Sequence, residues 1–186
     1  MKRLLALSLV VACGHEEAGG KGADQPELAP GAAKLSVTST AFAEGAEIPI
    51  DHTCEGADIA PALAWSGAPA QTRAFAIVVD DPDAPDPAAP KQTWVHWVVV
   101  GLPASATSLP AGGALPAGAA AGTNDFGKAA WGGPCPPIGR HRYVFKVYAL
   151  DAALGQPGMT KKQLLAAIAG HVIGAGQLIG TYQKKK

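Results

Sequence analysis

The chain has 186 residues, of which 48% are hydrophobic and 16% are charged, and its 15 basic side chains are balanced by 15 acidic ones. This length and apolar content are typical of one packed domain and argue against a largely disordered chain. Because the charges balance, the composition predicts no nucleic-acid-binding surface. The three lysines at 184–186 are expected to form a solvated tail.

The beginning of the chain predicts export and membrane anchoring. A basic start precedes an apolar run that is too short to span a bilayer, as in a signal peptide. The run ends in Val-Val-Ala-Cys, which resembles a bacterial lipoprotein cleavage box, so residues 1–12 are expected to be removed and Cys13 to carry lipid. An ordinary secretory signal with an incidental cysteine is the alternative. Residues 13–33, rich in Gly, Ala and charged side chains, predict a flexible tether.

Residues 34–183 are expected to form a mostly β domain. Residues 35–41 alternate apolar and polar side chains, which predicts a half-buried strand. The run 74–79 is continuously apolar, so we expect a central strand covered on both faces. Thr160 can cap a helix with Gln163 as its capping-box partner. In chain order the expected strands cover residues 35–41, 62–65, 74–79, 94–102, 143–150 and 178–182, with Pro- and Gly-rich loops at 81–90 and 103–122.

Two segments far apart in the sequence place titratable side chains beside apolar strands. One is Asp81-Pro82-Asp83-Ala84-Pro85, followed by His96 within an apolar strand. The other ends in His141-Arg142-Tyr143 and begins with Gly-Gly-Pro-Cys-Pro-Pro. Prolines fix the backbone beside these groups, and stiff loops that carry His, Asp and Tyr at strand ends predict a small preformed pocket. A lone strand histidine is also compatible with an ordinary core residue.

These motifs, together with Asn124-Asp125-Phe126-Gly127 and Gly180-Thr181-Tyr182 and in this order, resemble the phosphatidylethanolamine-binding protein family. The branch is the bacterial and archaeal one, called Raf-kinase-inhibitor-like or YbhB/YbcL-type. The resemblance implies a β-sandwich with one or two short helices and a small cavity for phosphate or phosphate esters. The ligand-binding residues that follow from it are Asp81, Asp83, Pro85, His96, Gly132, Gly133, Pro136, His141 and Tyr143.

The chemistry of these side chains suits an anion. Imidazole N–H, Tyr O–H and backbone N–H groups donate to anionic oxygens. Asp81 would repel an anion if it faced it, so we expect it either to orient a histidine or to accept from an amine or hydroxyl group of the ligand. A histidine pair that charges as the pH falls predicts tighter binding at low pH. Arg140 and Arg142 are expected to point away from His141 into surface salt bridges.

Two cysteines, Cys54 and Cys135, remain after lipidation of Cys13. Both lie in expected loops, and an exported protein meets an oxidising compartment, so we expect a disulfide between them. His, Cys and Asp side chains of the kind that bind zinc occur in these loops, but without short-range ligand pairs, so the sequence predicts no metal. It also predicts no cofactor.

The expected function is that of an exported, lipid-anchored protein that faces the periplasm or the cell exterior and binds an anionic small molecule. Its membrane contact is the lipid on Cys13. The first alternative is a protease inhibitor or another module that binds an envelope protein. The second is a hydrolase that uses the Asp/His pocket, although no G-x-S-x-G motif occurs.

Overall fold

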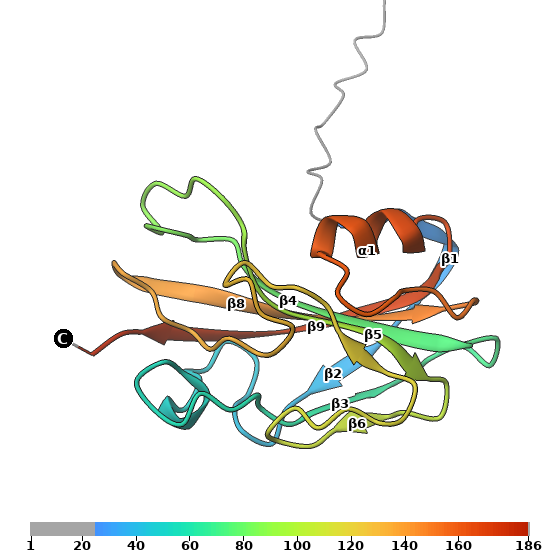
Figure 1. Ribbon diagram of the computed structural model, residues 1–186, viewed down its shortest axis with the longest axis horizontal. Coiled ribbons are helices and arrows are strands. Elements are labelled where there is room, and N and C mark those ends of the chain that lie inside the picture. Colours follow the sequence, from blue (N-terminus) through green and yellow to red (C-terminus); the bar gives the residue numbers. More distant parts are fainter. Residues whose placement is uncertain (1–24, 186) are drawn as a thin grey trace, which may run out of the picture.

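The computed structural model describes residues 25–185, so the expected signal peptide, Cys13 and most of the expected tether lie outside the described residues. The described chain forms two β-sheets packed face to face, with an α-helix on the outer face of the larger sheet (Figure 1). In chain order the elements are β1 (Leu28–Lys34), β2 (Ser36–Thr38), the 3-10 turn η1 (Ile50–His52), β3 (Leu63–Ser66), β4 (Ala74–Asp81), β5 (Trp94–Pro103), β6 (Ser108–Leu109), β7 (Ala120–Ala121), β8 (Arg140–Leu150), α1 (Lys161–Ile168) and β9 (Val172–Gln183).

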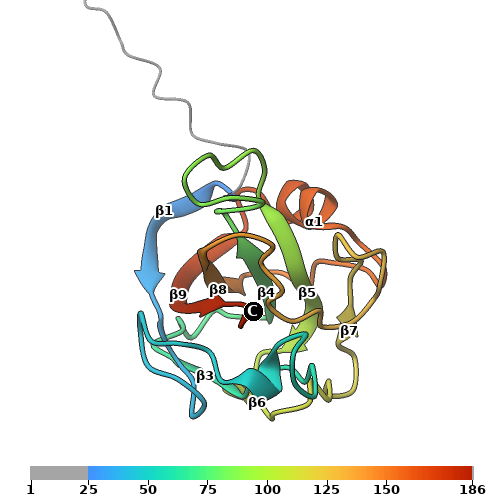
Figure 2. The same cartoon turned by 90° about the vertical axis from the view of Figure 1, so that its left-hand side faces the viewer.

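The larger sheet has six strands in the order β1-β9-β8-β4-β5-β7, and the smaller has three in the order β2-β3-β6. Figure 1 shows the smaller sheet below the larger one and α1 above it, and Figure 2 shows the same layers from the end at which the C-terminus lies. The mostly β sandwich with one short α-helix among the described residues confirms the expected fold.

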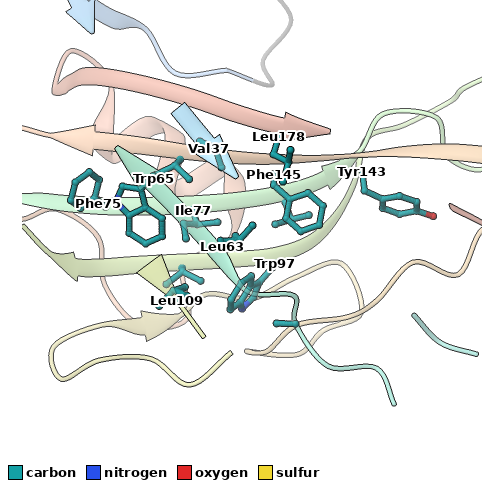
Figure 3. Packing of buried hydrophobic residues seen from close by; sticks show 14 of the residues in the cluster. Val37, Leu63, Trp65, Phe75, Ile77, Trp97, Leu109, Tyr143, Phe145 and Leu178 are labelled. Atoms are coloured by element: carbon teal, nitrogen blue, oxygen red, sulfur yellow. The ribbon is translucent and has the colours of Figure 1, made fainter. Parts of the chain in front are cut away.

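The central strand β4 is buried over its whole length because both of its faces are covered. Phe75, Ile77 and Val79 point into the core between the two sheets, part of which is drawn in Figure 3, while Ala76 and Val78 point toward α1. This arrangement explains the continuous apolar run and confirms the expected central strand. The neighbours of β4 are β5 and β8, both antiparallel to it.

The helix begins as the sequence predicts. The Thr160 hydroxyl accepts from the Gln163 N–H, and the Gln163 side chain accepts from the Thr160 N–H at 2.9 Å, so both halves of the capping box are present. Leu164, Leu165 and Ile168 are buried against the larger sheet.

A buried ion cluster also ties α1 to the sheet. Asp80 Oδ2 accepts from Lys161 Nζ at 2.7 Å and from Lys146 Nζ at 3.0 Å, and all three side chains are buried. Lys161 is the first residue of α1, so the helix start is fixed to the end of β4. The next residue, Asp81, turns to the other face of the sheet, where the cavity described below lies.

The folded part begins earlier than the expected boundary at residue 34. The expected tether includes residues 28–33, but these residues belong to β1, which pairs in parallel with β9 at the edge of the larger sheet. The reason is that an edge strand can be held by backbone hydrogen bonds alone, so its small and mostly exposed side chains carry little pattern. Strands β8 and β9 also begin before the expected starts at 143 and 178, and the short strands β6 and β7 lie in the expected loop 103–122.

Candidate functional site

A cavity of about 220 Å³ lies at the end of the larger sheet where β4 ends and β5 and β8 begin. The three strands are neighbours and antiparallel, so the end of one meets the starts of the other two. Loops after β4 and before β8 complete the walls. The lining residues are Asp81, Ala84, Pro85, Gln92, Trp94, His96, Phe126, Cys135, Pro136, Pro137, His141 and Tyr143.

Asp81 and His141 form a buried pair at the base of this site. His141 Nδ1 lies 2.7 Å from Asp81 Oδ2, and His141 Nε2 lies 2.9 Å from the Ile138 carbonyl oxygen. A carbonyl accepts only, so Nε2 carries a proton, and a second proton must lie between Nδ1 and the carboxylate. The pair therefore has no net charge. Burial raises the pKa of the Asp81 carboxyl, and the hydrogen bond from His141 acts in the opposite direction.

His96 reaches the cavity because β5 carries a bulge at this point. Val79 is opposite Trp97 and Asp80 is opposite Val95, so His96 is an extra residue without a partner on β4. The bulge turns His96 and Trp97 to the same side, where their rings lie 6.5 Å and 5.8 Å from that of Trp131. Bulges commonly redirect a side chain in this way beside functional sites.

The His96 ring is a hydrogen-bond acceptor toward the cavity. Nδ1 lies 2.6 Å from the Gly132 carbonyl oxygen, so it must carry a proton and donate. Burial lowers the pKa of His96 to about 4, so the ring is neutral at physiological pH. A neutral ring with a proton on Nδ1 has a lone pair on Nε2, and the hydrogen bonds of this ring within residues 25–185 go to the backbone of Gly132, with a smaller contribution from that of Gly133. The expected histidine pair that charges as the pH falls is therefore not supported at His96, because burial holds the pKa of this ring well below its usual range.

Tyr143 brings a donor that has no partner. Its side chain is fully buried, and its hydroxyl makes no hydrogen bond within the described part of the chain. The ring lies edge-on to His96 with centroids 5.1 Å apart. Figure 3 shows the hydroxyl pointing away from Phe145 and the rest of the core cluster. Burial also raises the pKa of the phenol, so Tyr143 stays protonated and can donate.

The Asn124–Gly127 motif holds the aromatic side of the cavity. Asn124 Nδ2 donates to the His96 carbonyl at 3.2 Å, and Asp125 Oδ2 accepts from the Val95 N–H at 2.8 Å. These contacts fix the loop to β5 and place the Phe126 ring 5.4 Å from Trp94 and 5.5 Å from His96. The motif therefore fixes the loop to β5 and holds the Phe126 ring in place as part of the cavity wall.

The proline-rich wall is fixed to a second loop. Cys54 and Cys135 form the expected disulfide, with their Cα atoms 5.4 Å apart. The Cys54 N–H also donates to the Pro134 carbonyl at 3.1 Å, and the Gly133 N–H donates to Asp58 Oδ1 at 2.7 Å. Three links thus hold the segment before Pro136 in place.

Six of the nine residues expected to bind ligand line the cavity, and three do not. Asp83 forms a bidentate ion pair with Arg142, with distances of 2.9 Å and 2.6 Å, and the hydrogen bond from Arg142 lowers the pKa of Asp83. Gly132 lies behind His96, where a Cβ would come 2.6 Å from the Phe126 ring. The Gly133 N–H donates to the Asp58 side chain and is therefore not available to a ligand.

The structure also differs from the sequence-based expectation in the position of His141 and in part of the cavity lining. The strand expected at residues 143–150 leaves His141 outside it, but β8 begins at Arg140, so His141 is a buried strand residue. Sequence reasoning also missed Gln92, Trp94 and Phe126 as lining residues. Phe126 belongs to the Asn124–Gly127 motif and Trp94 begins the strand expected at residues 94–102, but nothing in the sequence distinguishes a residue that lines a cavity from a core residue. The expected salt bridges of Arg140 and Arg142 are present, with Glu47 and Asp83.

Within residues 25–185, no cluster of three or more His, Cys, Asp or Glu side chains is arranged to hold a metal ion. In the same residues, no helix is long and apolar enough to cross a membrane.

The chain belongs to the phosphatidylethanolamine-binding protein family, whose sequence model matches residues 38–183. The crystal structure of CT736 from Chlamydia trachomatis, a phosphatidylethanolamine-binding protein homologue, superposes with a TM-score of 0.76 at 38% identity, covering 82% of this chain and 99% of CT736. Escherichia coli YbcL gives a TM-score of 0.72 at 36% identity over 82% of this chain and all of YbcL, which confirms the bacterial branch. A Mycobacterium tuberculosis relative named Putative lipoprotein LppC is 40% identical over 195 residues, covering 95% of this chain and 92% of LppC.

Proposed function

We propose that the protein is an exported, lipid-anchored binding protein whose cavity takes a phosphate ester or a similar small anionic ligand. The observation that carries the proposal is the Tyr143 hydroxyl, a buried donor with no partner among the described residues. An unsatisfied buried donor is costly, and such groups are rare unless a water or a ligand completes them. An anionic oxygen seated beside His96 would accept from it.

The walls support a ligand that has an organic part. Trp94, Phe126, Pro85, Pro136 and Pro137 give the cavity apolar and aromatic sides around a few polar atoms. Small-molecule sites commonly combine such walls with a few polar groups that fix orientation. Phosphate esters, which join an acidic head to an organic group, fit this division better than inorganic phosphate.

The lining favours binding over hydrolysis. Tyr143 is the single hydroxyl-bearing residue among the cavity-lining residues, and Cys135 is tied up in the disulfide. A covalent hydrolase needs an activated nucleophile next to a base. A protein-binding role has one observation in its favour: Phe126 and Ile138 are 42% and 57% exposed on the loops around the cavity. These apolar side chains suit a contact with an envelope protein.

The proposed membrane anchor is the lipid on Cys13, which lies outside the described residues. Support comes from the cleavage-box sequence and from the similarity to LppC, whose name describes a lipoprotein and whose match extends over 95% of this chain. An anchor of this kind would hold the cavity outside the cytoplasm.

Calorimetric titration with phenyl phosphate near pH 5.5 tests the binding function. We expect the wild type to bind and Tyr143→Phe to bind roughly tenfold to a hundredfold more weakly, because one hydrogen bond to a charged group is worth about 1.5–3 kcal/mol. Tyr148→Phe is the matched control, because Tyr148 lies on the same strand but faces α1. Equal affinity in all three proteins, or no binding by the wild type, would contradict the proposed cavity.

A further inference from the structure

The cavity has no free positive charge to neutralise an anion. None of its lining residues is Lys or Arg. The charged groups that face it are Asp81, at the end of β4, and His141, on β8, and these two neutralise each other. Arg142 and Arg140 are next to His141 in sequence, but they pair with Asp83 and Glu47 and do not line the cavity.

Besides the Gln92 amide and the Trp94 indole, His96 and Tyr143 bring polar groups to the cavity, and the structure fixes opposite hydrogen-bonding roles for these two. His96 comes from β5 and is committed as an acceptor, because Nδ1 donates to the Gly132 carbonyl at 2.6 Å and Nε2 keeps its lone pair. Tyr143 comes from β8 and is a donor with no partner in the described residues. The two ring centroids lie 5.1 Å apart, and both residues line the cavity.

A ligand that satisfies both groups must itself donate one hydrogen bond and accept another. A fully ionised phosphate monoester has three acceptor oxygens and no donor, so it would place an oxygen against the His96 lone pair. It would also bring two negative charges into a partly desolvated site without a counter-ion, which is unfavourable. A singly protonated monoester has a P–O–H group for His96 and anionic oxygens for Tyr143.

We infer that the cavity selects its acidic ligand in the singly protonated form, with His96 as the residue that determines this specificity. This inference rests on the proposed function and deepens it, since it names the ionisation state of the ligand. The P–O–H group of the ligand donates a hydrogen bond to His96 Nε2, and an anionic oxygen of the ligand accepts one from the Tyr143 hydroxyl. A phosphate diester, which is always a monoanion but has no P–O–H group, lacks the first contact.

The affinity should depend on pH through the ionisation of the ligand. Affinity for phenyl phosphate should fall by roughly 25-fold from about pH 5.5 to about pH 7.5, because the second ionisation of such a monoester lies near pH 6 and leaves few monoanions at the higher pH. His96, with its pKa lowered to about 4, and the disulfide-bonded Cys135 keep their charge in this interval. The diester is the control for the Asp81–His141 pair, because a change in the charge of that pair would alter the affinity for the diester as well. Methyl phenyl phosphate, a diester, should bind weakly at both pH values and with equal affinity.

The test is a titration of the purified wild-type protein with both compounds at the two pH values, together with ³¹P NMR of bound phenyl phosphate. The expected spectrum keeps the monoanion chemical shift in the complex at a pH where the free compound is already dianionic. Phenyl phosphate that binds equally at both pH values, or is bound as the dianion, overturns the inference while leaving the proposed function standing. A diester that matches the monoester near pH 5.5 overturns it as well. No binding of either compound overturns both proposals.

Discussion

Replacing His141 with alanine should destabilise the fold, because it leaves Asp81 buried without its ring partner. The His141 side chain is 0% exposed, that of Asp81 is 5% exposed, and the two are 2.7 Å apart. Removing one member of a buried ion pair costs about 3–5 kcal/mol. Since 1 kcal/mol corresponds to about 2–4 °C for a chain of this size, the melting temperature should fall by roughly 10 °C. The Ile138 carbonyl loses its donor at the same time.

The loss should be larger at high pH. Burial already raises the pKa of Asp81, and the hydrogen bond from His141 opposes that rise, so the variant should raise it further. A carboxyl whose pKa is higher in the folded state than in the unfolded state loses stability as the pH rises from the unfolded value through the folded value. At pH 5 the variant can still bury Asp81 as a neutral carboxylic acid. At pH 8 it must either bury a charged carboxylate or keep Asp81 protonated at a pH where the unfolded chain is ionised, and both cost stability.

Urea unfolding followed by circular dichroism at pH 5 and pH 8 measures both effects. His171→Ala is the control, because His171 also pairs with an aspartate at 2.9 Å but both side chains are more than 40% exposed. Breaking such an exposed pair should cost less than about 1 kcal/mol. If His141→Ala costs no more than His171→Ala, or loses no more stability at pH 8 than at pH 5, the assignment of a buried, mutually dependent pair is wrong.

Three further predictions address other parts of the molecule. Tyr143→Phe should raise the unfolding free energy of the ligand-free protein by about 1 kcal/mol, since it removes an unsatisfied buried hydroxyl; a lower value in urea titration would mean that the hydroxyl has a partner. Reduction of the Cys54–Cys135 bridge, which spans a sequence separation of 81 residues, should lower stability by about 4 kcal/mol in the chain-entropy model. Equal melting of oxidised and reduced protein would contradict this. Cys13→Ser should move the protein from the membrane to the soluble exported fraction on cell fractionation, and unchanged membrane recovery would refute lipid anchoring.

The sequence predicted the elements whose side chains carry a strong pattern. The buried run of β4 and the capping box before α1 were both found where expected. Strand β1 was missed because Leu-Ala-Pro-Gly-Ala-Ala-Lys has few large side chains, and its pairing with β9 depends on backbone groups that no composition reveals. A strand that is held by backbone hydrogen bonds to a segment distant in sequence has no local side-chain pattern that would predict it.

The candidate site was predictable as a set of residue types but not as a set of hydrogen bonds. The side-chain period of two would place His96 and Trp97 on opposite faces of β5, and only the bulge brings them to the same side. The roles of donor and acceptor followed from the Gly132 carbonyl beside His96 and from the lack of a partner for Tyr143 in the described chain. Both depend on three-dimensional neighbours far away in sequence.

Two consecutive carboxylates at the end of β4 connect opposite layers of the molecule. Asp80 forms an ion pair with Lys161, the first residue of α1, and Asp81 pairs with His141 on the cavity side. A shift of the helix that moved the Asp80 backbone would therefore be passed to the cavity across a single peptide bond. Searches for variants with altered affinity for the proposed ligand should accordingly include positions beneath α1, on the face of the sheet opposite the cavity.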